Sequence, residues 1–213
     1  MIPVIPQPEP LNFDEMVRQR GQKFLRKFTT TQPTTGQWKE NAYWNKLQAE
    51  FYKAYKGICA YSAHWIPRSD NPNIDHYIPK VIRPDLAYEW NNYRLACPLV
   101  NGCKGNSENI LDPFTIQKDW FTLDFPALLV KPNTTLDKRD YDKVKNTIDR
   151  LKLNDDKFID VRSNWLMGYC LGEASFYCLK NGAPFIAYEL ERQNIVTKIK
   201  IIMGYISDLE EEE

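Results

Sequence analysis

The strongest constraint on the fold is a loss of hydrophobic periodicity in the middle of the chain. Residues 59 to about 126 are dense in proline, asparagine, tyrosine, cysteine and aspartate, contain both histidines and lack helical periodicity until Leu99. The segments on either side place apolar residues at the three-to-four spacing of helices. Functional residues tend to lie on irregular segments that regular elements brace. The sequence therefore predicts an α+β protein with a mainly helical scaffold around one irregular unit.

The helical patterns predict where the scaffold lies. Residues 1–11 are proline-rich and should be extended, and a polar linker should follow the first helix over residues 29–36. We expect one compact body in three parts, residues 1–57, 58–130 and 131–213. Helices are predicted over residues 12–28, 38–56, 137–151, 158–179 and 195–206.

Composition narrows the class of protein. The 213 residues are 43% hydrophobic and 26% charged, which suits one ordinary folded core. No run of 18 apolar residues is present, and the start of the chain does not read as a signal peptide, so we expect a cytoplasmic protein. Five cysteines in such a setting are expected to be free thiols or metal ligands.

The charge balance limits binding to nucleic acid. Lysine and arginine number 28, and aspartate and glutamate also number 28. Asp208 and Glu210 to Glu213 form a terminal acidic run that should be solvated and mobile, and without it the body carries a charge of plus five. Such a mild charge predicts weak binding unless a partner protein helps.

The middle segment carries four motifs in a fixed order. It reads CAYS at residues 59–62, NIDHYIPK at 73–80, YEWNNYRLAC at 88–97 and VNGCKG at 100–105. This order resembles the HNH endonuclease family over about 50 residues. The resemblance implies a small ββα-metal unit that hydrolyses phosphodiester bonds, with Asp-His on a strand, a middle asparagine and a short helix that carries the fourth motif.

The chemistry of phosphodiester cleavage fits these residue types. A neutral imidazole suits removal of a proton from water, so His76 is the predicted general base. Asp75 and the amide oxygen of Asn101 are hard oxygen ligands, which favours Mg²⁺ or Mn²⁺. Asn92 is expected to orient the imidazole or the loop that carries it. Two lysines are placed to contact backbone phosphates of the nucleic acid, Lys80 and Lys104.

The adjacent residues Asp75 and His76 place a geometric requirement on the strand that carries them. Neighbouring residues on a flat strand point to opposite faces. Asp75 and His76 can therefore serve one phosphate only at a strand end or a bulge. Prolines at positions 72 and 79 make a short strand plausible there.

The cysteines depart from the family pattern. Many HNH proteins hold a structural zinc with two Cys-x-x-Cys pairs, and the corresponding positions here are Cys59, Ser62, Cys97 and Val100. Serine and valine do not replace thiolates, so no structural zinc is expected at these four positions. An alternative stays open in which His64 and Cys103 join the two remaining cysteines as a Cys₃His site.

A narrower resemblance concerns proteins that are encoded beside a particular partner. Residues 86–97, with Asn101 and LDPF at 111–114, look like the HNH proteins encoded beside an ATPase in bacterial anti-phage systems of the Septu and retron type. This resemblance implies an effector nuclease that acts on DNA with an ATPase partner. The sequence does not separate DNA from RNA or tRNA as the substrate.

Two other functions stay open. The first is an inactive HNH-fold module that binds nucleic acid or a partner protein, which the loss of zinc ligands favours. The second is a thiol hydrolase that pairs Cys59 or Cys97 with His64 or His76, although no oriented third group can be named.

Overall fold

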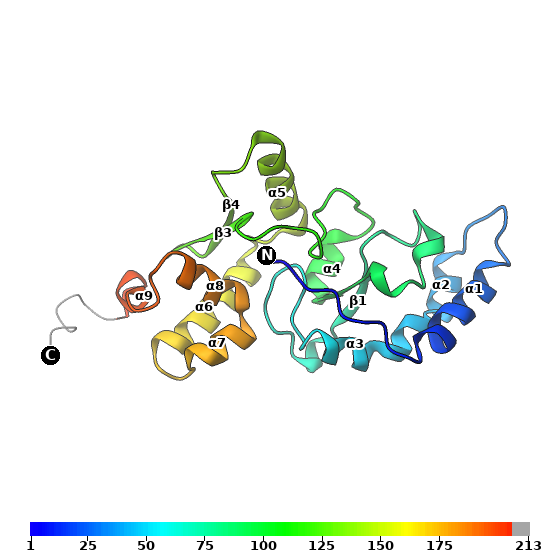
Figure 1. Ribbon diagram of the computed structural model, residues 1–213, viewed down its shortest axis with the longest axis horizontal. Helices are drawn as coiled ribbons and strands as arrows, with labels where there is room; N and C mark the ends of the chain where they lie inside the picture. Colours follow the sequence, from blue (N-terminus) through cyan, green and yellow to red (C-terminus); the bar gives the residue numbers. More distant parts are fainter. Residues whose placement is uncertain (206–213) are drawn as a thin grey trace. The chain divides into compact units, whose positions relative to one another are not determined.

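The structure, a computed structural model, describes residues 1–205 and divides into two compact units. The N-terminal unit comprises residues 4–60 and 66–108, and the C-terminal unit comprises residues 1–3, 61–65 and the chain from 109 on (Figure 1). These bounds differ from those of the three expected parts, residues 1–57, 58–130 and 131–213. Ile206 and the acidic run from Asp208 lie outside the described residues.

The N-terminal unit begins with the elements that the apolar pattern predicts. Residues 1–10 form neither helix nor strand, as expected for a proline-rich segment. Gln7 is fixed to the body of the unit, because its carbonyl accepts a 2.7 Å hydrogen bond from Trp90 Nε1 and its N–H donates to the Tyr55 hydroxyl at 3.1 Å. The predicted first helix consists of a π-helical turn, η1 (Asp14–Arg18), and α1 (Gln19–Leu25).

The predicted continuous helix over residues 38–56 is wrong. The segment forms α2 (Thr35–Glu40), a 3₁₀-helix η2 (Tyr43–Leu47) and α3 (Gln48–Ala54). The side chain of Asn41 ends α2 by donating to the Gln37 carbonyl at 2.9 Å. The break lets Trp44 turn inward, where its ring lies 4.6 Å from the ring of His76.

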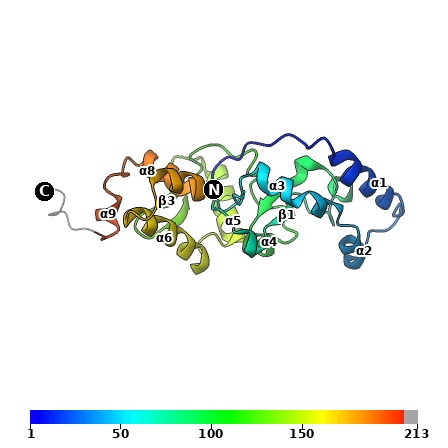
Figure 2. The same ribbon diagram turned by 90° about the horizontal axis from the view of Figure 1, so that it is seen from below.

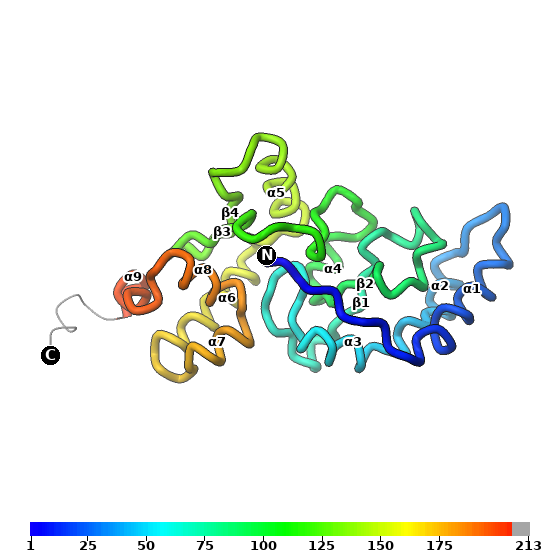
Figure 3. The backbone as a smooth tube through the Cα atoms, in the orientation of Figure 1, coloured from blue at the N-terminus to red at the C-terminus, as the bar shows by residue number. Residues whose placement is uncertain are grey.

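The middle of the unit is built in the order strand, strand, helix. Strand β1 (Asn73–His76) pairs antiparallel with β2 (Tyr93–Ala96), with Asp75 opposite Arg94 and His76 opposite Tyr93. Helix α4 (Pro98–Lys104) follows after one residue. Both views place β1 beside α3 and α4 (Figure 1, Figure 2), and the backbone tube shows the two strands next to each other (Figure 3). Short 3₁₀-helices occupy the connections, at Arg68–Asp70, Pro84–Leu86 and Trp90–Asn92.

The C-terminal unit combines a hairpin with helices. The hairpin β3 (Phe121–Asp124) and β4 (Leu129–Pro132) was not predicted. The buried carboxylate of Glu189 accepts from the Leu123 N–H at 2.9 Å, and the Asn154 amide bonds both main-chain groups of Val130. The helices are α5 (Lys138–Leu151), α6 (Asp156–Cys170), α7 (Phe176–Gly182), α8 (Pro184–Arg192) and α9 (Ile199–Ile202).

The observed helices correct two predicted boundaries. The helix expected over 158–179 is divided between α6 and α7, and the one expected over 195–206 is the single turn α9 within the described residues. No helix in residues 1–205 is long and apolar enough to cross a membrane.

One close helix contact can be tested by substitution. A Cβ at Gly21 would lie 2.0 Å from the ring of Tyr88, whereas a Cβ at Gly36 would meet nothing within 4 Å. Gly21→Ala should therefore destabilise the protein by about 1–3 kcal/mol through overpacking. Gly36→Ala in α2 should leave stability unchanged or raise it by at most about 1 kcal/mol. Urea unfolding measures both, and equal midpoints for the two variants would contradict the contact.

Candidate functional site

The end of β1 positions the predicted Asp-His pair. His76 is the last residue of the strand, which satisfies the demand for a strand end. The two side chains leave the strand toward different neighbours. Asp75 bonds Lys104 at the end of α4, and His76 contacts Trp44 of η2. The pair is thus held from two sides, by the helix that follows the hairpin and by an element that precedes it in the chain.

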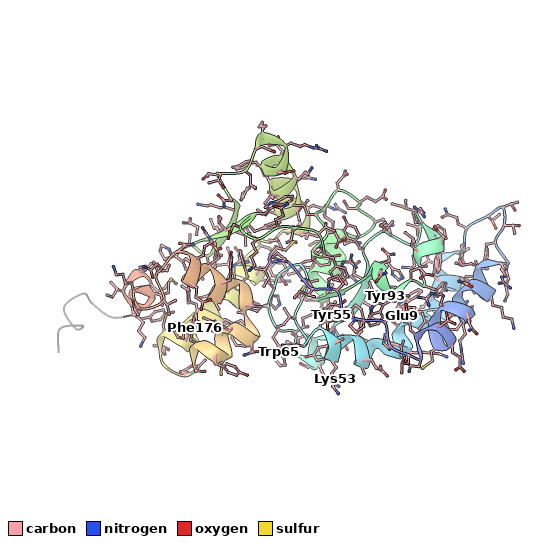
Figure 4. The ribbon with its side chains drawn as sticks, in the orientation of Figure 1. Glu9, Lys53, Tyr55, Trp65, Tyr93 and Phe176 are labelled. Atoms are coloured by element: carbon pink, nitrogen blue, oxygen red, sulfur yellow. The ribbon has the colours of Figure 1, made fainter. Side chains whose placement is uncertain are left out.

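The imidazole of His76 is held by one main-chain carbonyl and two aromatic rings. Its Nε2 lies 2.9 Å from the Ala87 carbonyl oxygen, which also accepts from the Tyr93 hydroxyl at 2.9 Å. The rings of Trp44 and Tyr93 lie edge-on to it, with centroids at 4.6 and 5.2 Å, and Tyr93 is labelled in Figure 4. Only 6% of the residue is exposed. The ring is therefore fixed in one orientation.

These contacts also determine the state of the ring. A carbonyl oxygen only accepts hydrogen bonds, so Nε2 carries the proton and Nδ1 keeps its lone pair. Burial lowers the pKa of His76 to about 3, helped by the positive charges of Lys80 and Lys104 and opposed by the Ala87 hydrogen bond. The imidazole is thus neutral at physiological pH and has a nitrogen that can accept a proton.

Asn92 holds the loop after His76 and does not contact the ring. Its Oδ1 accepts from the Ile78 N–H at 2.8 Å, and its Nδ2 donates to the Ile78 and Leu86 carbonyls at 3.0 and 3.1 Å. Leu86 immediately precedes Ala87, whose carbonyl holds the imidazole. The amide therefore fixes both ends of the loop that surrounds the ring, which is the second of the two roles predicted for it.

A buried ion pair joins β1 to α4. Lys104 Nζ lies 3.1 Å from Asp75 Oδ1 and donates to the His76 carbonyl at 2.7 Å. Lys104 is 0% exposed and Asp75 is 5% exposed. One ammonium group thus balances the carboxylate and holds the backbone of the predicted base.

This position corrects the role predicted for Lys104. A fully buried ammonium group engaged with Asp75 is not available to a phosphate at the surface. Lys80 lies differently, because it is partly exposed and its Nζ is 5.6 Å from the centre of the Trp44 ring. Partial burial lowers its pKa, and the charge of Asp75 acts in the opposite direction. The role of Lys80 as a phosphate contact stays a prediction.

The oxygen ligands predicted for a metal come from adjacent elements. Asn101 of α4 donates through Nδ2 to Asn73 Oδ1 at 3.4 Å, and Asn73 precedes Asp75 by two residues on the same face of β1. This hydrogen bond leaves the carbonyl oxygen of Asn101 as a candidate ligand. Because Lys104 already balances Asp75, the donors fit Mg²⁺ only as a site completed by phosphate oxygens and water, as is common for this ion.

The cysteines at the positions of the family's zinc ligands are buried. The sulfurs of Cys59 and Cys97 lie 3.9 Å apart, with 0% and 6% exposure. His64 belongs to the other compact unit, and Cys103 is half-buried on α4. Over residues 1–205 no group of three or more histidine, cysteine, aspartate or glutamate side chains is arranged to hold a metal. Burial of the two thiols does not separate the thiol hydrolase from a hydrolase that uses His76, since Cys97 and His76 are each 6% exposed.

Sequence reasoning missed three groups that surround the imidazole. Trp44 belonged to an apolar stripe that was assigned to a helix core, and Tyr93 was only one residue of the third motif. The role of the Ala87 carbonyl could not be recognised from the sequence, because every residue has a main-chain carbonyl.

The chain was also compared with known proteins. No protein-family model matches it, and no curated protein matches its sequence.

The buried ion pair predicts a specific pattern of stability. Lys104→Met leaves the Asp75 carboxylate buried without its cation and should cost about 3–5 kcal/mol. The double variant Asp75→Asn with Lys104→Met should cost less than the sum of the single changes, by about 1–3 kcal/mol. Urea unfolding of the four proteins measures the coupling. Lys53→Met, at an exposed position on α3 that Figure 4 labels, is the control and should change stability by less than about 0.5 kcal/mol.

Burial of His76 predicts that stability depends on pH. Its pKa is about 3 when folded against 6.5 when unfolded, so between these values the unfolded chain binds the extra proton. The free energy of unfolding is therefore highest above pH 6.5. It decreases as the pH falls from 6.5 toward 3, by at most about 1.4 kcal/mol per pH unit. His76→Gln in metal-free buffer should show a shallower decline between pH 6.5 and 4.5 than the unchanged protein. Parallel curves would contradict the assignment.

Proposed function

We propose that this protein is a metal-dependent endonuclease of the HNH type that cleaves DNA in the cytoplasm. The observation that carries the proposal is the state of His76, a neutral imidazole fixed through Nε2 with Nδ1 left as a proton acceptor. A general base must be neutral and correctly oriented to accept a proton, and a pKa of about 3 makes His76 a weaker base than an imidazole with its usual pKa. The order of β1, β2 and α4 agrees with the ββα unit that the sequence motifs imply.

The reaction assigned to this site is hydrolysis of a phosphodiester. A water molecule at Nδ1 of His76 gives up a proton to the ring as its oxygen bonds to phosphorus. The bond from phosphorus to the leaving oxygen then breaks, and that oxygen takes a proton from solvent. A bound Mg²⁺ or Mn²⁺ would supply positive charge to the phosphate oxygens. Asp75 and Asn101 would hold it, while Asn92 and Trp44 position the ring.

The balance of charge gives the site a further property. Lys104 offsets the charge of Asp75, so the protein ligands alone contribute no net negative charge to attract a cation. A phosphate at the site adds that charge. Metal and nucleic acid are therefore expected to bind together, each strengthening the other.

A partner protein is the second part of the proposal. The resemblance to effector nucleases of anti-phage systems suggests an ATPase, and the near-neutral charge of the chain agrees with help in DNA binding. Antiviral defence would be the biological role. Cleavage assays with and without an ATPase encoded by an adjacent gene test this part of the proposal.

The competing function is a module that has the fold without the activity. The pairing of Asp75 with Lys104 favours it, because a carboxylate engaged by an ammonium group is a weaker metal ligand. The nuclease is preferred because His76 is held as a base requires. An inactive module has no need of that arrangement.

Cleavage assays separate the two functions. Purified protein with Mg²⁺ or Mn²⁺ should cleave DNA oligonucleotides, and His76→Ala should lower the rate by at least about a hundredfold. Asn101→Ala should raise the Mg²⁺ concentration needed for half-maximal cleavage, whereas Asn91→Ala, at an exposed neighbouring position, should not. Full activity of His76→Ala would refute the general base, and no cleavage with either metal or the ATPase would favour the inactive module.

A further inference from the structure

A groove without carboxylates lies beside the candidate site. It has a volume of about 740 Å³ and lies within the N-terminal unit. Two cations, Lys39 and Lys80, line it. None of the described residues that line it carries a carboxylate, although the chain has 28 acidic residues. A surface of this kind favours a polyanion. The other polar lining consists chiefly of amides, from Asn45, Gln48, Asn71, Asn73 and Asn106.

The groove reaches the candidate site at two points. Trp44 lines it and has its ring 4.6 Å from the ring of His76. Asn73 lines it and accepts the hydrogen bond from Asn101. The groove therefore touches a neighbour of the predicted base and a neighbour of the predicted metal ligand. A molecule bound in it would lie beside the reacting centre.

A second hollow continues the groove away from the centre. It has a volume of about 390 Å³ and shares four lining residues with the first. Lys46 and Arg68 are its cations, and again none of the described lining residues carries a carboxylate. Arg68 also lies over the ring of Tyr52, 5.0 Å from its centre. The two hollows together form a track with cations along its length.

The size and chemistry of the track indicate an unpaired strand. Volumes of about 300–1,000 Å³ suit ligands of drug size, so each hollow takes one or two nucleotides and not the paired strands of a duplex. The side chains of Asn45, Asn71 and Asn106 offer both donors and an acceptor, as the free edges of unpaired bases require, whereas Asn73 and Gln48 already donate to main-chain carbonyls of the protein. In a duplex those edges are already paired.

One buried donor in the groove is without an acceptor. Trp38 lines the groove, is 3% exposed, and its Nε1 has no hydrogen-bond partner. A buried N–H without a partner costs about 1–3 kcal/mol. An oxygen of a bound base or phosphate would satisfy it after a small movement of the ring.

From these observations we infer that the substrate of the proposed nuclease is a single strand of nucleic acid, which lies in the track between Lys39 and Arg68 with one phosphate at His76. The inference rests on the proposed function for the cleavage step. Binding of the strand is a separate property, because it depends on residues outside the predicted catalytic set.

The test measures binding without cleavage. Fluorescence anisotropy in EDTA compares a labelled single-stranded oligonucleotide of 12 nucleotides with the duplex of the same sequence. The single strand should bind at least about tenfold more tightly. Lys39→Gln should weaken its binding by about tenfold and reduce the dependence on salt by about 0.7 in the log–log slope. Asn45→Asp, which places a carboxylate in both hollows, should also weaken binding.

Lys53→Gln is the matched control, because Lys53 is exposed on α3 and lines neither hollow. The inference would be overturned if Lys39→Gln and Lys53→Gln lost equal affinity for the single strand, or if the duplex bound more tightly than the single strand, even if the protein cleaves DNA. Conversely, the track would be supported and the nuclease refuted if only Lys39→Gln lost affinity for the single strand while the unchanged protein showed no cleavage in Mg²⁺.

Discussion

The contact between Lys104 and Asp75 is the interaction on which the rest of the site depends. It joins the helix after the hairpin to the first strand, and it does so without exposure to water. Because the same ammonium group donates to the His76 carbonyl, the backbone that carries the imidazole is fixed by it. A buried pair of this kind contributes little net stability compared with apolar residues, but loss of one partner is costly. It specifies how α4 is placed against β1.

Both main-chain and side-chain groups hold the imidazole and its loop in place beside this ion pair. The Ala87 carbonyl fixes the imidazole, Asn92 fixes the main chain of the loop, and Trp44 covers one side of the ring. In the proposed nuclease, a site held in this way would be rigid before substrate arrives, which would lower the entropy cost of bringing the reacting groups together.

The motifs predicted the local structure well and the long-range structure less well. The strand at residues 73–76 and the short helix at 98–104 lie where the motifs indicated, because proline positions and helix signals act over a few residues. The break at Asn41 was not predictable, since the stripe through Trp44 and Phe51 continues across it and only tertiary packing turns Trp44 inward. The hairpin β3–β4 was missed because buried Glu189 and Asn154 complete it from distant segments. Lys104 was misjudged for the same reason, as sequence does not reveal a partner 29 residues away.

The use of a main-chain carbonyl at Ala87 has a consequence for the evolution of such proteins. The orientation of the ring depends there on the path of the backbone and on Asn92, which maintains that path, while the Ala87 side chain is buried and makes no polar contact of its own. Distant relatives could therefore diverge almost completely between Tyr77 and Leu86 and still keep an identically oriented histidine. Alignments that score identity would lose the signal in that stretch first, so ancestry would be traced better from backbone geometry.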